Sequence, residues 1–178
     1  MTSASPAPSR YDGLTIAIHW ISAVIVITLW LIGQLVDFVP RGPVRTGIWS
    51  THVTLGFLLA VLLITRIVWR LTSGRQLPPA ETGVLGLAAK LGHLALYALL
   101  IAVVALGLAD AFLRGFNMFD LFHLPQIGDR AWVRQVNGLH ELAANAVMAM
   151  ALLHAVAALF HRYVLKDQVL ARMGLGAN

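Results

Sequence analysis

The sequence contains no cysteine, and this absence excludes several kinds of redox site at once. Without a thiol there is no disulfide, no cysteine-ligated iron–sulfur cluster, no thiolate-ligated haem and no covalently attached c-type haem. Charged residues are also scarce, at 12% of the chain, which is about half their usual share in soluble proteins. Any metal or haem must therefore be held by other side chains, in a chain with too little charge to cover a water-facing surface.

What the chain has instead is apolar sequence, with 58% hydrophobic residues and a mean hydropathy of +0.77. A helix needs about 20 apolar residues to cross the hydrocarbon of a bilayer. Four stretches qualify, at about 14–36, 48–70, 87–112 and 136–163. The sequence therefore predicts an all-α, integral membrane four-helix bundle that forms one domain over residues 1–178. No run of Lys and Arg indicates nucleic-acid binding.

The first ten residues are short, polar and rich in Ser, Pro and Ala, and we expect them to form a disordered tail. The alternative is a secretory signal that extends to Gly33. It is disfavoured because the apolar stretch is longer than the apolar region of a signal and no clear small-x-small cleavage site follows it.

The charges between the spans are distributed unevenly. One side carries eight basic residues and three acids, and the other carries five of each. The basic residues of the first side are Arg10, Arg66, Arg70, Arg75, Lys90, Arg162, Lys166 and Arg172. Because basic residues accumulate on the cytoplasmic side, both termini are predicted to be cytoplasmic. The apolar loop at 113–135 is then expected to lie at the periplasmic interface as a lid.

The interiors of the four spans lack Asp, Glu, Lys and Arg, but every span carries histidine. Ionisable groups inside a membrane are costly and usually functional. His140 and His154 are 14 residues apart on one helix, which is about 21 Å and just under four turns. Both imidazoles therefore face nearly the same way, one near each membrane face.

Depth matching gives each of these histidines a partner. His52 lies about one turn into its span from the periplasmic side and pairs with His140. His19 lies about one turn into its span from the cytoplasmic side and pairs with His154. Paired imidazoles in a cysteine-free chain predict two b-type haems with two histidine ligands each. The alternative for any single histidine is an ordinary hydrogen bond between helices.

The other candidate site residues are predicted with less support from spacing. His93 has no depth-matched partner left, and with Tyr97 it is a candidate contact for a haem propionate or a quinone. His161 is predicted to be solvated at the membrane edge, and His123 to be a surface residue. Candidate contacts for propionates or an anion are Arg10, Arg66 and Arg70 inside, and Arg41, Arg45, Arg114, Arg130 and Arg134 outside. The alternative for the outer arginines is pairing with nearby Asp residues.

Several short motifs resemble the bacterial cytochrome b561 family, whose members are small, dihaem and quinone-linked. They are Arg10-Tyr11-Asp12, Ile18-His19-Trp20, His52 with Gly56, Leu91-Gly92-His93-Leu94 with Tyr97, Leu139-His140-Glu141, Leu153-His154-Ala155, and the run from Lys166-Asp167 to Arg172-Met173. The resemblance covers nearly the whole chain. It implies that His19, His52, His140 and His154 are the axial haem ligands and that ubiquinone is a redox partner.

The resemblance also implies an inner-membrane oxidoreductase that moves electrons between a periplasmic donor and ubiquinone. Some members of the family are similar to superoxide:ubiquinone oxidoreductases, and others conduct electrons for a partner enzyme such as a hydrogenase, so the donor is superoxide or a redox protein. The loop at 114–134 departs most from the family pattern. A haem-free transporter is the alternative of another class, but transporters more often carry acidic residues or broken helices at mid-membrane.

Overall fold

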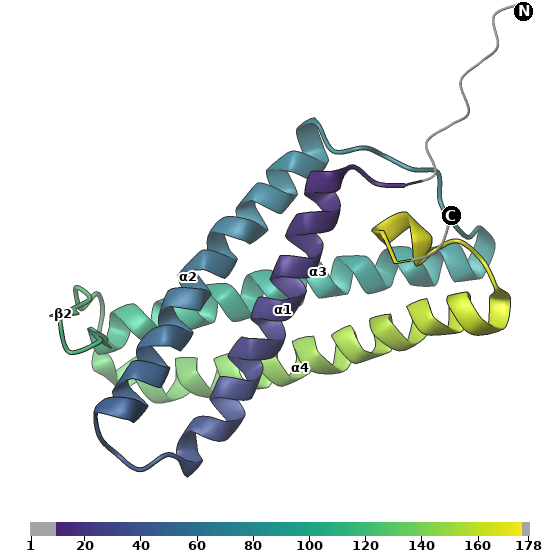
Figure 1. Ribbon diagram of the computed structural model, residues 1–178. Coiled ribbons are helices and arrows are strands. Elements are labelled where there is room, and N and C mark those ends of the chain that lie inside the picture. The colour runs from purple at the N-terminus through teal and green to yellow at the C-terminus, as the bar shows by residue number, and fades with distance from the viewer. Residues whose placement is uncertain (1–9, 176–178) are drawn as a thin grey trace, which may run out of the picture.

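The structure is a computed structural model that describes residues 10–175, so the predicted tail before Arg10 lies outside the described residues. Four long helices make up most of it: α1 (Gly13–Leu35), α2 (Pro43–Thr72), α3 (Gly83–Arg114) and α4 (Val133–Phe160) (Figure 1). All four are long and apolar enough to cross a membrane. The prediction of an all-α chain with four spanning helices is confirmed, and α2 and α3 begin four or five residues before the predicted spans and end two residues after them.

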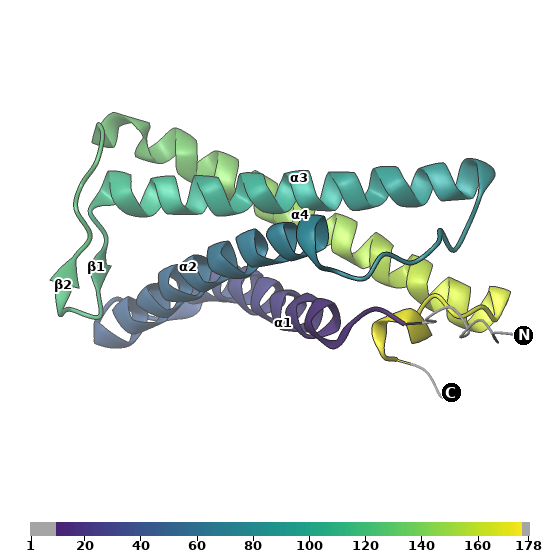
Figure 2. The ribbon, with the colours of Figure 1, turned by 90° about the horizontal axis from the view of Figure 1, so that it is seen from above.

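The helices form two antiparallel pairs. α1 packs along α2, and α3 packs along α4 over the greatest length, whereas α1 meets α4 at few positions and α2 hardly approaches α4. In Figure 1 the α1–α2 pair is visibly inclined to the α3–α4 pair, and Figure 2 shows the same two pairs from above. The two pairs therefore leave α4 loosely packed against α1 and α2, which carry the other predicted ligands.

The connections contain short elements that the sequence did not predict. The helical turn η1 (Val36–Phe38) follows α1, the turn η2 (Arg130–Trp132) leads into α4, and the π-helical turn η3 (His161–Leu165) and the turn η4 (Ala171–Met173) follow it. The predicted outer lid contains a small antiparallel hairpin of β1 (Asn117–Met118) and β2 (Phe122–His123). Ser50, which is fully buried in α2, holds this hairpin, because its hydroxyl accepts a 2.8 Å hydrogen bond from the Phe119 amide.

The buried interior is small. Among the described residues the buried apolar side chains are Ile18, Ile25, Val36, Leu59, Leu63, Ala111, Met118, Ala143 and Val147. Large apolar side chains such as Val24, Val61, Leu94 and Leu152 are instead more than half exposed along the helices. This exposure of apolar side chains suits a chain whose solvent is lipid, because burying an apolar side chain there gives no hydrophobic stabilisation.

Both ends of the described chain lie at the same end of the bundle (Figure 1). The Tyr11 amide donates a 3.1 Å hydrogen bond to the Arg172 carbonyl, and the Trp20 indole donates one of 3.1 Å to the Met173 carbonyl. The Arg172 guanidinium in turn donates to the Pro78 carbonyl at 2.7 Å. The even number of spans thus returns the chain to its starting side, and the assignment of this side to the cytoplasm stays a prediction from charge.

Asp12 organises this end of the bundle. As the N-cap of α1 it accepts hydrogen bonds from the amide and the hydroxyl of Thr15, and it also accepts from the Trp69 indole at 3.0 Å and the Arg75 amide at 3.0 Å. Desolvation of the carboxylate raises the pKa of Asp12, but the hydrogen bonds from Thr15, Arg75 and Trp69 outweigh it and hold the pKa well below its ordinary value. One side chain therefore joins the start of α1 to the end of α2.

We expect Asp12→Ala to lower the free energy of unfolding by about 1–2 kcal/mol, because the helix loses its N-cap and the indole loses its acceptor. Since the folded pKa is lowered, the ionised carboxylate stabilises the protein above its unfolded pKa of about 3.9, and this contribution is lost as the pH falls towards the folded value. Asp12→Asn keeps an oxygen acceptor for Thr15 and should remove only this acid sensitivity. Thermal unfolding in detergent at pH 7 and pH 3.5 measures both; equal pH dependence of the native protein and Asp12→Asn would contradict the assignment.

Candidate functional site

The structure brings His52 of α2 and His140 of α4 together at one end of the bundle. Their ring centres are 6.2 Å apart, with the ring planes at 78°. His140 Nδ1 lies 2.9 Å from the Val103 carbonyl oxygen on α3. Because a carbonyl only accepts, Nδ1 carries the proton and the lone pair of the neutral ring is on Nε2, where a metal binds.

Gly107 on α3 makes this placement of His140 possible. A Cβ at Gly107 would lie 2.8 Å from His140 Cε1, closer than side chains tolerate. Val103 and Gly107 are one helical turn apart, so the same face of α3 supplies both the carbonyl that orients the imidazole and the space that the ring occupies. The third helix therefore positions a ligand that the fourth helix carries.

His19 of α1 and His154 of α4 form the second pair, at the opposite end. Their ring centres are 6.4 Å apart, with the planes at 67°. The 14 residues from His140 to His154 place the two pairs about 21 Å apart along α4. The structure thus holds one imidazole pair near each end of the bundle, and α4 contributes to both.

His93 of α3 joins the second pair. Its ring centre is 5.4 Å from that of His154, which the sequence analysis had already paired with His19. The antiparallel packing of α3 on α4 brings the two residues to the same height. His93 is exposed on the bundle surface, whereas His19 and His154 are partly buried.

Arg66 of α2 contacts both His19 and Tyr97. Its Nη2 lies 3.2 Å from His19 Nδ1, and its Nε donates a 2.9 Å hydrogen bond to the Tyr97 hydroxyl. The guanidinium carbon is also 5.2 Å from the centre of the Tyr97 ring, within the range of a cation–π contact. Since a guanidinium only donates, His19 Nδ1 is the acceptor here, and metal binding through His19 Nε2 would require this contact to give way.

The spacing of both pairs fits two imidazoles on one metal. A metal–imidazole nitrogen bond is about 2.0–2.1 Å, so two such bonds plus the distance from each nitrogen to its ring centre give about 6.3 Å. The two pairs lie at 6.2 and 6.4 Å. His52 Nδ1 is, in addition, a buried nitrogen without a hydrogen-bond partner in the described part of the chain. Both pairs lie between helices that pack loosely, so the residues fit a flat cofactor at each height.

Some of the arginines predicted to contact an anion already have a side-chain partner in the structure. Arg114 donates to Asp110 at 2.7 Å and to Asn137 at 3.1 Å, and Arg45 is paired with Asp37. For these two arginines the alternative of pairing with an acid or amide is confirmed.

Arg41 is exposed and lines an open hollow with Arg45, Trp49 and Asn117. The Trp49 ring centre is 5.5 Å from that of His52, so this hollow adjoins the outer imidazole pair. At the end of the bundle where the termini lie, Arg66 and Arg70 line a cleft with Tyr97, while Arg10 is exposed and its carbonyl accepts a hydrogen bond from Arg75.

Sequence reasoning missed a polar contact at mid-membrane. The Trp30 indole of α1 donates a 2.9 Å hydrogen bond to the Asn145 side-chain oxygen of α4. Asn145 lies between the two ligand positions of α4 and links the helices that carry the second pair. Because a side-chain amide is not ionisable, attention to the ionisable groups in the spans did not single out Asn145.

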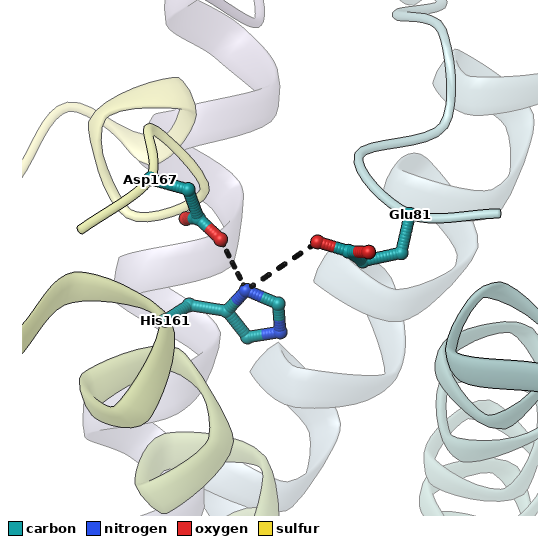
Figure 3. Close-up of side chains that lie close together, drawn as sticks. All are labelled: Glu81, His161 and Asp167. Atoms are coloured by element: carbon teal, nitrogen blue, oxygen red, sulfur yellow. Dashed lines mark hydrogen bonds and ion pairs between the residues drawn. The ribbon is translucent and has the colours of Figure 1, made fainter. Parts of the chain in front are cut away.

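Two further histidines lie outside the pairs. His123 is exposed on the hairpin, as predicted. His161 was predicted to be solvated, which is wrong: it is 20% exposed and its Nδ1 lies 2.5 Å from an Asp167 oxygen and 4.0 Å from a Glu81 oxygen (Figure 3). The π-helical turn after α4 folds the chain back, so that Asp167 meets His161.

Comparison with known proteins gives a consistent set of relatives. The family profile described as prokaryotic cytochrome b561 matches residues 10–176. The chain is 32% identical to a probable superoxide oxidase CybB of Yersinia pestis, over 92% of this chain and 95% of that one. It is 31% identical to cytochrome b561 homolog 2 of Escherichia coli K12, with 96% and 94% covered, and 34% identical to a cytochrome b562 of Cereibacter sphaeroides, with 92% and 94% covered.

We expect Gly107→Ala to displace the His140 ring and so to weaken cofactor binding at the outer pair alone. Purified Gly107→Ala protein should contain less haem per chain than the native protein, as measured by the pyridine haemochrome. Gly92→Ala on the same helix is the matched control, because nothing lies within 4 Å of a Cβ at that position. An unchanged haem content in Gly107→Ala, or a reduced haem content in Gly92→Ala, would contradict this account of the close approach.

Proposed function

Because this chain belongs to the prokaryotic cytochrome b561 family, a family of haem b membrane cytochromes, we propose that it carries electrons across the inner membrane between superoxide at the periplasmic face and ubiquinone. In this proposal it binds two b haems, one between His52 and His140 and one between His19 and His154. The single observation that carries the proposal is the pair of imidazole–imidazole distances, 6.2 and 6.4 Å, at the two ends of α4.

Haem b, when bound, supplies a reversible one-electron couple at each of these heights. His52 with His140, and His19 with His154, would hold the two haems, and haem iron held by two imidazoles favours electron transfer over binding and activation of oxygen. α4 fixes the vertical separation, since one rigid helix carries a ligand of each pair. The Val103 carbonyl holds His140 in the tautomer that presents Nε2.

The outer face supports an anionic donor. Arg41 is unpaired among the described residues and lies in the hollow with Arg45 and Trp49, next to the His52 ring. A positive hollow raises the encounter rate of a small anion such as superoxide. The relative named a probable superoxide oxidase supports this choice of donor. The cytoplasmic assignment of the opposite side, from the excess of basic residues there, makes this face periplasmic.

The inner face supports a lipid-soluble acceptor. His93 is exposed on the bundle surface while its ring lies 5.4 Å from that of His154. One imidazole therefore reaches both the lipid and the inner pair, and it offers a hydrogen bond to a quinone carbonyl. Tyr97 lies one turn further along α3 and contacts Arg66. In this arrangement Arg66 and Arg70 are the candidate partners of propionates.

The ligand assignment predicts which haem each substitution removes. His52→Ala should lose the outer haem and retain the inner one, and His19→Ala should do the reverse. On α4, His140→Ala should repeat the first result and His154→Ala the second. Haem quantification with electron paramagnetic resonance of each variant measures this, and His123→Ala is the control. If His52→Ala retained both haems, the assignment of the outer pair would be contradicted. If His19→Ala retained both haems, the assignment of the inner pair would be contradicted.

The reaction itself is tested by mixing the oxidised protein with superoxide and a short-chain ubiquinone. Two superoxide ions and two protons should convert one quinone to quinol with release of two oxygen molecules, and the haem absorption should change first. Arg41→Gln should slow this phase several-fold and weaken its dependence on salt, while reduction by dithionite is unchanged. If superoxide does not reduce the protein, the chain is instead a cytochrome subunit that serves another enzyme.

A further inference from the structure

Three metal-ligating side chains meet at the inner end of the bundle, away from both imidazole pairs. They are Glu81 from the connection before α3, His161 from the start of η3, and Asp167 from the turn after it (Figure 3). One ligand atom of each lies within 4.8 Å of the other two. We propose that Glu81, His161 and Asp167 bind one divalent transition-metal ion of the Zn²⁺ class.

The cluster is close in size to a tetrahedral metal site, and an ion would replace the short hydrogen bond between His161 and Asp167. In a tetrahedral site with bonds of about 2.0–2.1 Å, ligand atoms are separated by about 3.4 Å. His161 Nδ1 is 2.5 Å from Asp167 Oδ2 and 4.0 Å from Glu81 Oε1, so the observed separations lie on both sides of this value. The Glu81 carboxylate points at the imidazole from a distance too long for a hydrogen bond, as Figure 3 shows.

The local charge also favours a cation. Two carboxylates share a single imidazole nitrogen, and within the described residues neither has a Lys or Arg within 4.0 Å, although Arg162 and Lys166 are close in sequence. Arg172 approaches Asp167 only at longer range and is itself bound to the Pro78 carbonyl.

The backbone holds the three ligands in place before any ion binds. Asp167 Oδ1 accepts from the Val169 amide at 3.0 Å, which leaves Oδ2 for the cluster. Lys166 adopts a left-handed conformation with φ of 54°, and the Asp167 amide closes the turn on the His161 carbonyl at 3.1 Å. On the other side, a Cβ at Gly86 would lie 2.5 Å from the Glu81 carbonyl, so this glycine lets the chain turn tightly beside Glu81.

The ligand set selects the class of metal. One imidazole nitrogen and two carboxylate oxygens suit Zn²⁺ and its first-row neighbours, whereas Mg²⁺ and Ca²⁺ prefer oxygen alone. Binding through Nδ1 displaces the proton that His161 shares with Asp167, and this proton leaves to solvent. Three protein ligands leave a fourth position for water. The ion would tie the segment after α4 to the α2–α3 connection.

The test uses the intact, haem-loaded protein in detergent, stripped with a chelator and then titrated with Zn²⁺ against a chromophoric zinc chelator. We expect one Zn²⁺ per chain, at least tenfold weaker binding for Glu81→Gln and for His161→Gln, and no change for His123→Gln. Glu81→Gln is the decisive variant, because the Glu81 carboxylate makes no hydrogen bond within the described structure. Haem content and gel filtration establish that each variant is folded.

Failure to bind Zn²⁺ at 1:1, or unchanged affinity in Glu81→Gln, would overturn the proposal. Equal affinity for Ca²⁺ and Zn²⁺ would overturn the role of the imidazole. The readout is bound zinc, so these outcomes are independent of whether superoxide or quinone reacts with the protein.

Discussion

The separation of the two imidazoles in each pair, 6.2 and 6.4 Å between ring centres, is the constraint on which the rest of this structure depends. It matches the separation of about 6.3 Å that one metal between two imidazoles would set, and helices that carry such a pair cannot pack as closely as helices that interlock small side chains. α1 and α2 accordingly stand away from α4, while α3 packs closely along it. The bundle is two tight helix pairs joined through loosely packed seams, and each seam holds one pair of histidines.

Lipid as the solvent explains why so few apolar side chains are buried among the described residues. In lipid the helices gain little from hiding apolar surface, so their arrangement is set by specific contacts. Such contacts occur at three heights: the hairpin on Ser50 at one end, the Trp30–Asn145 bond between the two imidazole pairs, and the Asp12 carboxylate at the end where the termini lie. Hydrogen bonds at these three heights therefore hold the four helices together, and the imidazole pairs lie between them.

Hydropathy and histidine spacing predicted the four spans and the depth at which each imidazole lies, because both follow from helix geometry alone. They could not predict that α3 brings His93 beside His154, or that Val103 and Gly107 support His140, since neighbours across a helix interface depend on packing angles. The contact of Asp167 with His161 depends on a π-helical turn and a left-handed Lys166, which no periodicity records. Sequence reasoning was thus reliable along each helix and incomplete between helices.

The bond between Trp30 and Asn145 has a mechanical consequence. It is a pivot about which α1 can rock against α4, and His19 lies 11 residues from Trp30, which is a lever of about 16 Å. A rocking angle of about 5° at this pivot therefore displaces the His19 backbone by about 1.4 Å. His52 is carried by α2, which packs tightly along α1, so a change in the tilt of this helix pair alters the gaps at both ends of the bundle together.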